Sequence, residues 1–252
     1  MLSAAQIKSI RSLAQKKERD ASGLFVAEGS KCVNELLQYF DCQLLILPKE
    51  DTSHYLGRIA ETVYASPKEI ERASFQKTPQ GVIAMFKKPD SSLPDPNKKE
   101  LYLALDKVQN PGNLGTIIRL ADWFGIRHIF CSLDTADAFG SKTVQATMGA
   151  LGRVSIHYTD LSEFLLKIKP TIPVYGTFLG GDSIYNASLP DNAVIVMGNE
   201  GNGISNQIAE CIDHRLEIPA FTNGNETSES LNVAVATAIV CSEFRRRSLV
   251  IK

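Results

Sequence analysis

Residues 101–252 alternate short apolar runs with segments of helical periodicity. The apolar runs occupy residues 101–105, 128–131, 154–157, 173–178, 193–197 and 216–218. Runs without polar alternation are typical of strands that are buried on both faces, as in a parallel sheet covered by helices. We therefore predict an α/β domain with a mostly parallel sheet, and we expect its ligand site at the carboxyl ends of the strands.

A second region precedes this pattern, and a linker separates the two. Residues 87–100 contain three prolines, two serines and four lysines, which can neither pack a core nor continue a helix. We predict one domain over residues 1–90, a linker over 91–100 and a second domain over 101–252. The first domain is expected to be a small α/β sandwich. Its helices are predicted near residues 7–13, 33–37 and 67–73, and its strands over 23–27, 43–47, 62–65 and 82–86.

The composition is that of a globular protein, with 44% hydrophobic residues, 22% charged residues and a net charge of -1. No apolar run reaches the length of a membrane span, and charges recur through residues 1–17, so we expect a cytoplasmic protein without a membrane segment. The five cysteines include no Cys-x-x-Cys pair, which favours buried, reduced thiols. The histidines stand alone in the sequence, so no metal site is expected; they are His54, His128, His157 and His214.

Positive charge is concentrated near the amino terminus. The cluster consists of Lys8, Arg11, Lys16, Lys17 and Arg19. It is either a solvated helix face or a surface for nucleic-acid phosphates, and the local sequence leaves both open. Because the net charge is -1, any surface for nucleic acid must be local.

The first of three short motifs follows the predicted strand at 101–105. Residues 110–113 (Asn-Pro-Gly-Asn) predict a turn, and residues 114–124 predict a helix with Asn113 as its N-cap. Arg119 lies inside this helix. From the local sequence alone, Arg119 is either a structural residue that snorkels or pairs with Asp122, or a site residue.

The second motif, residues 198–203, follows the strand at 193–197. Its sequence Gly-Asn-Glu-Gly-Asn-Gly predicts a tight turn that gives a ligand access to the backbone, with the carboxylate of Glu200 close by. A glycine-rich turn also occurs in dinucleotide-binding loops, but here the order is G-x-x-G-x-G and the loop does not follow the first strand of the domain. Because nicotinamide-dependent oxidoreductases also use a glycine-rich loop, such an enzyme stays open as an alternative.

The third motif follows the strand at 216–218. After a polar loop over residues 222–229, Ser230-Leu231-Asn232 opens a long helix that is rich in small residues. Small residues permit the close approach of another backbone, either within the chain or in a second copy. Ser230 is either a helix N-cap or a site residue.

Together the three motifs resemble the signature motifs of the SpoU (TrmH-type) RNA ribose 2'-O-methyltransferases, within the SPOUT superfamily. The matching segments are residues 113–119, 197–203 and 228–236. Residues 1–90, with Arg19, Phe25, Glu28 and Gly29 in an F-x-x-E-G arrangement, resemble the RNA substrate-binding domain of the family. Residues 101–252 resemble its SpoU methyltransferase catalytic domain.

The resemblance has implications for fold, cofactor and partners. It implies a SPOUT domain with a deep trefoil knot, an exception to the rule that chains avoid threading. It implies S-adenosyl-L-methionine as cofactor, RNA as substrate (ribosomal or transfer RNA), and a homodimer through the catalytic domain. No metal is required. A catalytically silent RNA-binding protein of the same fold is an alternative, and the loop between Pro219 and Ser230 is a few residues longer than is usual in the family.

The resemblance also implies the site residues. The catalytic candidates are Arg119, Asn113, Glu200, Ser230 and Asn232. The cofactor-binding candidates are Thr177, Gly198, Asn199, Gly203, Ile218, Pro219 and Leu231. A guanidinium stays protonated in proteins and is a poor base, so we expect Arg119 to hold the ribose hydroxyl or a neighbouring phosphate by charge-assisted hydrogen bonds. Deprotonation of Arg119 is the alternative.

Overall fold

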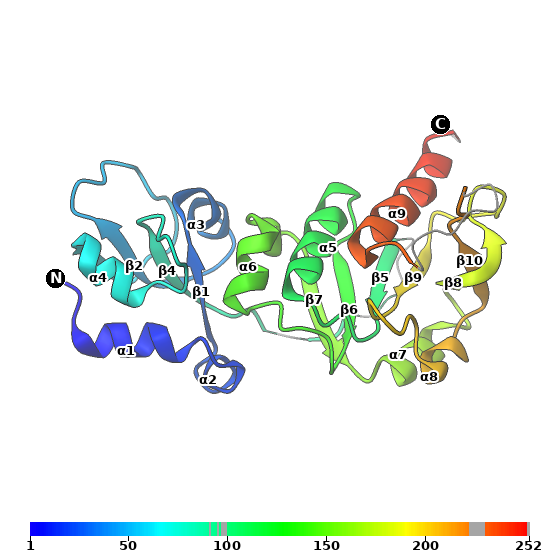
Figure 1. Cartoon of the computed structure of the whole chain (residues 1–252), viewed down its shortest axis with the longest axis horizontal. Helices are drawn as coiled ribbons and strands as arrows, with labels where there is room; N and C mark the ends of the chain where they lie inside the picture. Colours follow the sequence, from blue (N-terminus) through cyan, green and yellow to red (C-terminus); the bar gives the residue numbers. More distant parts are fainter. Residues whose placement is uncertain (91, 95, 97–99, 222–229, 251–252) are drawn as a thin grey trace. The chain divides into compact units, whose positions relative to one another are not determined.

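The structure is a computed structural model that describes residues 1–90, 92–94, 96, 100–221 and 230–250. Residues 247–250 are described by their backbone alone. Its contacts define two compact units (Figure 1). The first unit contains Met1–Asp90 and Asp137–Arg153, and the second contains Ser91–Ala136 and Val154–Lys252. Residues 137–153, which the sequence analysis places in the second domain, thus pack in the first unit.

The first unit is built on a four-stranded sheet of order β1-β4-β2-β3. Strand β4 runs antiparallel to β1 and β2, whereas β3 runs parallel to β2. The elements in this part are α1 (Ala4–Ser12), α2 (Lys16–Ser22), β1 (Leu24–Glu28), α3 (Ser30–Leu36), β2 (Cys42–Pro48), β3 (Thr62–Ala65), α4 (Pro67–Ala73) and β4 (Ile83–Lys87). Helix α4 begins where it was predicted, because Ser66 and Glu69 form a capping box in front of Pro67.

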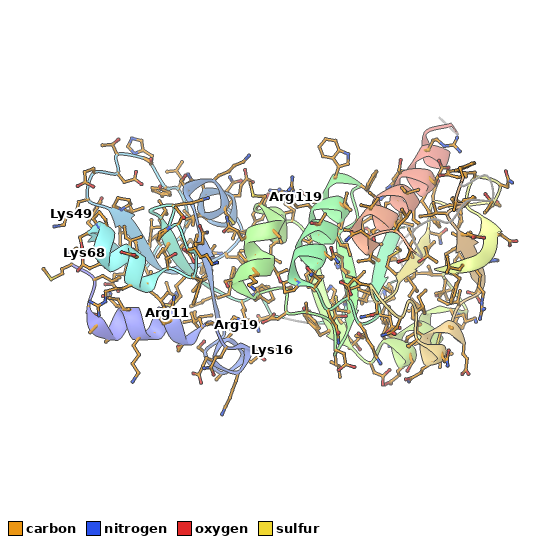
Figure 2. The ribbon with its side chains drawn as sticks, viewed as in Figure 1. Arg11, Lys16, Arg19, Lys49, Lys68 and Arg119 are labelled. Atoms are coloured by element: carbon orange, nitrogen blue, oxygen red, sulfur yellow. The ribbon has the colours of Figure 1, made fainter. Side chains whose placement is uncertain are left out.

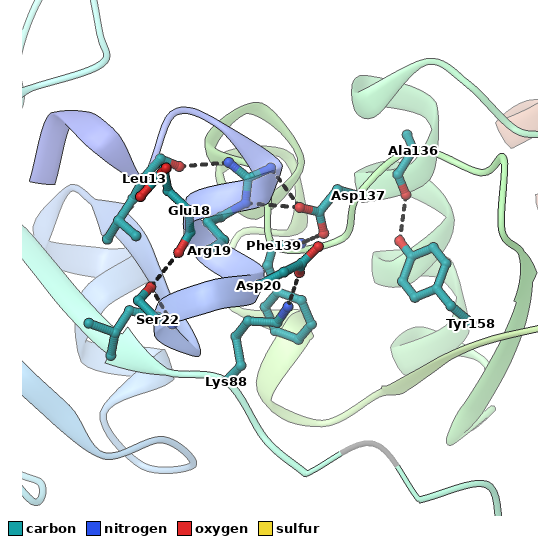
Figure 3. A network of polar contacts seen from close by, with 11 residues as sticks. Leu13, Glu18, Arg19, Asp20, Ser22, Lys88, Ala136, Asp137, Phe139 and Tyr158 are labelled. Atoms are coloured by element: carbon teal, nitrogen blue, oxygen red, sulfur yellow. Dashed lines mark hydrogen bonds and ion pairs between the residues drawn. The ribbon is translucent and has the colours of Figure 1, made fainter.

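Arg19 ties the inserted segment 137–153 to the amino-terminal helices. Its Nε and Nη2 donate to Oδ2 of Asp137 at 2.9 and 2.6 Å (Figure 3). Its Nη1 donates to the carbonyls of Leu13 and Ala14. Arg19 is only 5% exposed, so it does not belong to an accessible basic surface. The segment itself forms helix α6 (Ser141–Thr147) and the short 3-10 helix η1 (Ala150–Gly152).

The second unit contains a six-stranded sheet of order β10-β8-β9-β5-β6-β7, in which all adjacent strands are parallel. Its strands are β5 (Leu101–Leu105), β6 (His128–Ser132), β7 (Ser155–Thr159), β8 (Val174–Ser183), β9 (Ala193–Met197) and β10 (His214–Glu217). Its helices are α5 (Pro111–Trp123), α7 (Leu161–Ile168), α8 (Asn206–Ala209) and α9 (Val233–Val250). Helices α5 and α9 pack together, as do α7 and α8, and Figure 1 shows the two pairs on opposite sides of the sheet. The predicted parallel α/β architecture is confirmed.

The predicted start of α5 is wrong. The N-cap of α5 is Asn110, whose Oδ1 accepts hydrogen bonds from the backbone N–H groups of Gly112 and Asn113. Pro111 tolerates the first helical position because it has no N–H to satisfy, so the helix begins a turn earlier than the sequence suggested. Helix α9 opens within the predicted Ser230-Leu231-Asn232 segment, and the capping residue is Asn232, since its Oδ1 accepts from the backbone N–H of Ala234.

The expectation that each histidine stands alone is wrong for two of them. Strands β6 and β7 are neighbours, and they bring Nδ1 of His128 to 3.1 Å from Nε2 of His157. Burial, together with the charge of His128, lowers the pKa of His157 to about 4. No group of three potential metal ligands occurs among the residues that the structure describes.

The cysteines behave as predicted, since all five are buried and free. Burial raises the pKa of Cys32 and of Cys42 to about 11, which keeps both thiols protonated and unreactive near neutral pH. Among the helices that the structure describes, none is long and apolar enough to cross a membrane.

Candidate cofactor and catalytic site

A cavity of about 450 Å³ lies in the second unit beside the middle of β8 and the ends of β9 and β10. Its wall contains eight of the residues predicted for the site: Thr177, Gly198, Asn199, Glu200, Gly203, Ile218, Ser230 and Leu231. Pro219, also predicted to bind the cofactor, is not part of the wall. The volume lies within the range of about 300–1,000 Å³ that small-molecule sites occupy.

Gly198, in the wall of this cavity, lets the backbone approach that of Gly203 and Ile204 closely. A Cβ atom at this position would lie 2.2 Å from the carbonyl carbon of Gly203 and 2.3 Å from the backbone nitrogen of Ile204. Those atoms are backbone and cannot move aside independently, so only glycine fits. The backbone of Asn199 and Gly203 closes the turn with two hydrogen bonds, of 2.9 and 3.0 Å.

Two buried or half-buried side chains fix the glycine-rich loop to the end of β5. Asp106, which directly follows β5 and is fully buried, accepts a 2.7 Å hydrogen bond from the backbone N–H of Ser205. Nδ2 of Asn199 donates to the carbonyl of Lys107 at 2.8 Å. The cavity wall is therefore held in place by bonds between segments about 90 residues apart in the sequence.

Glu200 is the centre of a hydrogen-bond network that joins the second motif to the first. Its Oε1 accepts from Nδ2 of Asn113 at 3.0 Å and from the backbone N–H of Asn110 at 3.1 Å, and its Oε2 accepts from the backbone N–H of Gln109 at 3.3 Å. Burial alone would raise the pKa of Glu200, but these hydrogen bonds, that from Asn113 foremost, lower it below the ordinary 4.5. Glu200 is thus an ionised acceptor at neutral pH.

The third motif joins the same network through Asn232. Its Nδ2 donates to Oδ1 of Asn113 at 3.0 Å, across 119 residues of sequence. Asn113 therefore donates to Glu200 and accepts from Asn232, which fixes the orientation of its amide. We call Glu200, Asn113 and Asn232 the Glu200 network.

Arg119 lies outside both groups. It is exposed on α5 (Figure 2), and it belongs neither to the cavity wall nor to the Glu200 network. The structure thus brings together four of the five predicted catalytic residues, with Glu200 and Ser230 in the wall and Asn113 and Asn232 bonded to Glu200 or to each other. It leaves the fifth accessible to solvent.

Several residues of this site were not predicted from the sequence. The cavity wall also contains Phe178, Leu179, Met197, Gly201, Asn202, Ile204, Glu217, Val233 and Ala236. Most of these are apolar or lie inside motifs already recognised, so they carry no separate signal. Asp106 could have been found, because a carboxylate directly after a buried strand stands at the carboxyl edge of the sheet.

Comparison with known families identifies the chain. Residues 100–242 match the model of the SpoU rRNA Methylase family, and residues 4–84 match the MRM3-like substrate binding domain. The chain therefore belongs to the SpoU rRNA methylase family, which confirms the resemblance of the three motifs.

Individual relatives agree with this assignment over nearly the full length. The chain is 31% identical to the Bacillus subtilis 23S rRNA (guanosine(2553)-2'-O)-methyltransferase RlmP, over 95% of this chain and 96% of the relative. A solved structure from Porphyromonas gingivalis, described as a TrmH-family RNA methyltransferase, is 45% identical with a TM-score of 0.86 and covers 98% of this chain and 99% of that chain. The AdoMet-bound rRNA methyltransferase from Sinorhizobium meliloti is 32% identical, with a TM-score of 0.83 over 98% of this chain and 97% of that chain.

Proposed function

We propose that this protein transfers the methyl group of S-adenosylmethionine to the 2'-hydroxyl of a ribose in ribosomal RNA. The observation that supports this most strongly is the Glu200 network, which joins all three motifs beside a cavity of about 450 Å³. Family membership supports the reaction, and the AdoMet-bound relative supports the cofactor. A nicotinamide-dependent oxidoreductase, the alternative from the glycine-rich loop, has no comparable support.

The cavity suits S-adenosylmethionine in size and in lining. The apolar side chains of Ile218 and Leu231 would hold the nucleoside, while the polar groups of Thr177 and Asn199 and the open backbone at Gly198 would hold its polar edges. When bound, the cofactor supplies a methyl group on a sulfonium, which is a good electrophile without metal assistance.

The chain's own residues would position the ribose. A ribose hydroxyl is a poor nucleophile at neutral pH, so its orientation decides the rate. Asn113, held by Glu200 and Asn232, presents a fixed amide, and Ser230 supplies a hydroxyl in the cavity wall. Arg119 would hold the hydroxyl or its neighbouring phosphate by charge-assisted hydrogen bonds. Glu200 would act as an anchor and not as the base, because its lowered pKa makes it a weak proton acceptor.

For the substrate, we propose a guanosine of 23S rRNA. The support is the relative RlmP, whose name specifies that nucleoside and that RNA, and which matches both units of this chain. Residues 1–90 would bind the RNA, in keeping with the match of residues 4–84 to a substrate binding domain.

The test is methyl transfer from labelled S-adenosylmethionine to unmodified 23S rRNA, 16S rRNA and transfer RNA, followed by mapping of 2'-O-methylated nucleosides. We expect a single 2'-O-methylguanosine in 23S rRNA. Binding of cofactor and RNA without transfer to any of the three RNAs would favour a catalytically silent protein instead. Thermal stabilisation by NAD but not by S-adenosylmethionine would favour the oxidoreductase.

We also propose a homodimer through residues 101–252 and a trefoil knot in the catalytic domain, both from family membership. Exposed apolar side chains in the second unit support the dimer, since Phe221 is 84% exposed and Val235 is 51% exposed. A cytoplasmic location fits an enzyme that modifies ribosomal RNA. Sedimentation of the full chain at micromolar concentration should give a dimer, and a monomer would contradict the assembly.

A further inference from the structure

A second cavity, of about 320 Å³, lies within the first unit and is separate from the site described above. Two distant parts of the chain form it. Its wall includes Val26 and Glu28 of β1, Phe75 and Gln76 after α4, and Lys142 and Gln145 of α6. Four of these positions lie in residues 1–90, and the other two lie on α6 of the inserted segment 137–153, which packs in the same unit.

The wall formed by residues 74–76 is fixed in position. Glu28 is only 4% exposed, and its carboxylate accepts hydrogen bonds from Oγ of Ser74 and from the backbone N–H of Phe75. Arg11 of α1 donates to the carbonyl of Ser74, and its guanidinium lies 5.3 Å from the centre of the Phe75 ring. These contacts hold the wall in place before any ligand binds, which lowers the entropic cost of binding.

The cavity combines hydrogen-bonding groups of both kinds with apolar surface. Nε2 of Gln76 donates to Oε1 of Gln145 at 3.1 Å. This bond uses one donor of one amide and one lone pair of the other, so both amides retain capacity for a ligand. Glu28 adds carboxylate acceptors, Lys142 adds an exposed positive charge, and Phe75 adds an aromatic surface.

We propose that this cavity binds an unpaired base of the RNA substrate, and that guanine fits it best. A flat heterocycle is small enough for about 320 Å³ and can lie against the Phe75 ring. Guanine carries N–H donors on its Watson–Crick edge for the Glu28 carboxylate, and its O6 accepts from an amide N–H or from Lys142. This inference rests on the proposed RNA substrate, and it adds a recognition site distant in sequence from the three motifs.

The experiment compares full-length wild type with Gln145→Leu and Gln76→Leu, each of which replaces an amide in the cavity by an apolar side chain of similar size. Gln38→Leu is the matched control, because Gln38 is an exposed glutamine of the same unit that is not in the cavity wall. The measurements are the Kd for unmodified 23S rRNA, the single-turnover methyl-transfer rate at saturating RNA, the Kd for S-adenosylmethionine and the Tm.

We expect both cavity variants to bind the RNA about 10-fold more weakly, as the loss of a base contact does. Their methyl-transfer rate at saturating RNA and their cofactor affinity should stay within about 2-fold of wild type, because these depend on the second unit. Gln38→Leu should match wild type in every measurement. RNA containing 6-thioguanosine should crosslink, under near-ultraviolet light, to peptides that contain Phe75 or Gln145.

The proposal is overturned if both cavity variants bind RNA as wild type does, or if the crosslinks map only to other peptides. If wild type binds the RNA but transfers no methyl group, the proposed function fails while the comparison of RNA affinities still judges the cavity. If folded wild type binds S-adenosylmethionine but no RNA, the base-binding cavity is wrong as well.

Discussion

Arg19 and Arg119 both lie in helices and both belong to segments that the sequence marked as functional, yet their surroundings are opposite. Arg19, in the first unit, is 5% exposed and donates to the Asp137 carboxylate and to two backbone carbonyls. Arg119, in the second unit, is exposed and lies outside the cavity wall. Figure 2 shows each residue on its helix.

This difference in burial and hydrogen bonding indicates which of the two arginines can contact a ligand. A buried guanidinium whose donors are occupied stabilises the fold, since its removal would leave a carboxylate and two carbonyls without their partner. An exposed guanidinium gains little stability from its position, so its presence in a motif is better explained by a ligand. Arg19 therefore supports the fold, whereas Arg119 is exposed and is the one of the two that we propose contacts RNA.

The largest predicted effect is on Arg19. Arg19→Ala should lower the free energy of unfolding by about 3 kcal/mol, because it leaves Asp137, whose side chain is only 12% exposed, without a counter-charge. Chemical denaturation with constant m-value measures this. Lys88→Ala is the control. The Lys88–Asp20 pair (Figure 3) is partly exposed, with the Asp20 side chain 50% exposed, and its loss should cost no more than about 1 kcal/mol. Equal losses in the two variants would contradict the structural role of Arg19.

A second prediction contrasts Arg19, buried as a paired charge, with His157, buried as a neutral ring. The pKa of His157 is about 4 in the folded protein against an ordinary 6.5, so the unfolded chain binds a proton that the folded chain does not. The contribution of the neutral His157 ring to the free energy of unfolding should be fully present above pH 6.5. It should fall by up to about 3 kcal/mol as the pH drops from 6.5 towards 4. His157→Phe, which can keep the stacking on Phe130, should flatten this part of the pH profile. An unchanged profile would show that another group controls it.

A third prediction concerns the cavity floor. Gly198→Ala places a Cβ against the backbone of Gly203 and should cost about 1–3 kcal/mol of stability, with a loss of affinity for S-adenosylmethionine of at least about 10-fold. Gly201→Ala is the matched control in the same loop, because its Cβ would meet only the Asn199 side chain at 3.7 Å. If calorimetry finds wild-type affinity for S-adenosylmethionine in Gly198→Ala, the assignment of this cavity as the cofactor site is wrong.

The sequence predicted the strands well and the long-range contacts poorly. The buried run at 101–105 became β5 with the predicted bounds, because five buried apolar residues have few alternatives to a central strand. The pairing of Arg19 with Asp137 joins residues 118 apart, and no local pattern contains that information. The same holds for residues 137–153, whose helical periodicity does not reveal which unit they pack against.

At the site, too, some features were predicted from the sequence and others were not. Motif resemblance placed Gly198, Glu200 and Ser230 in one cavity wall, as the structure has them. A local rule failed at the start of α5, because Asn110 and Asn113 are both good capping residues and the local sequence does not decide between them. Asn110 caps the helix, and this leaves the Asn113 side chain to bond Glu200 and Asn232.

The role of Arg119 is tested most directly by single-turnover methyl transfer to 23S rRNA by Arg119→Ala, with the Tm measured on the same preparation. Because Arg119 is exposed and is proposed to engage the ribose, the rate should fall by roughly 100-fold or more while the Tm and the cofactor affinity stay close to wild type. Arg119→Lys should recover little of the rate if the planar fork of the guanidinium is needed. A near-normal transfer rate together with a lowered Tm would contradict the account, because it would make Arg119 a structural residue like Arg19.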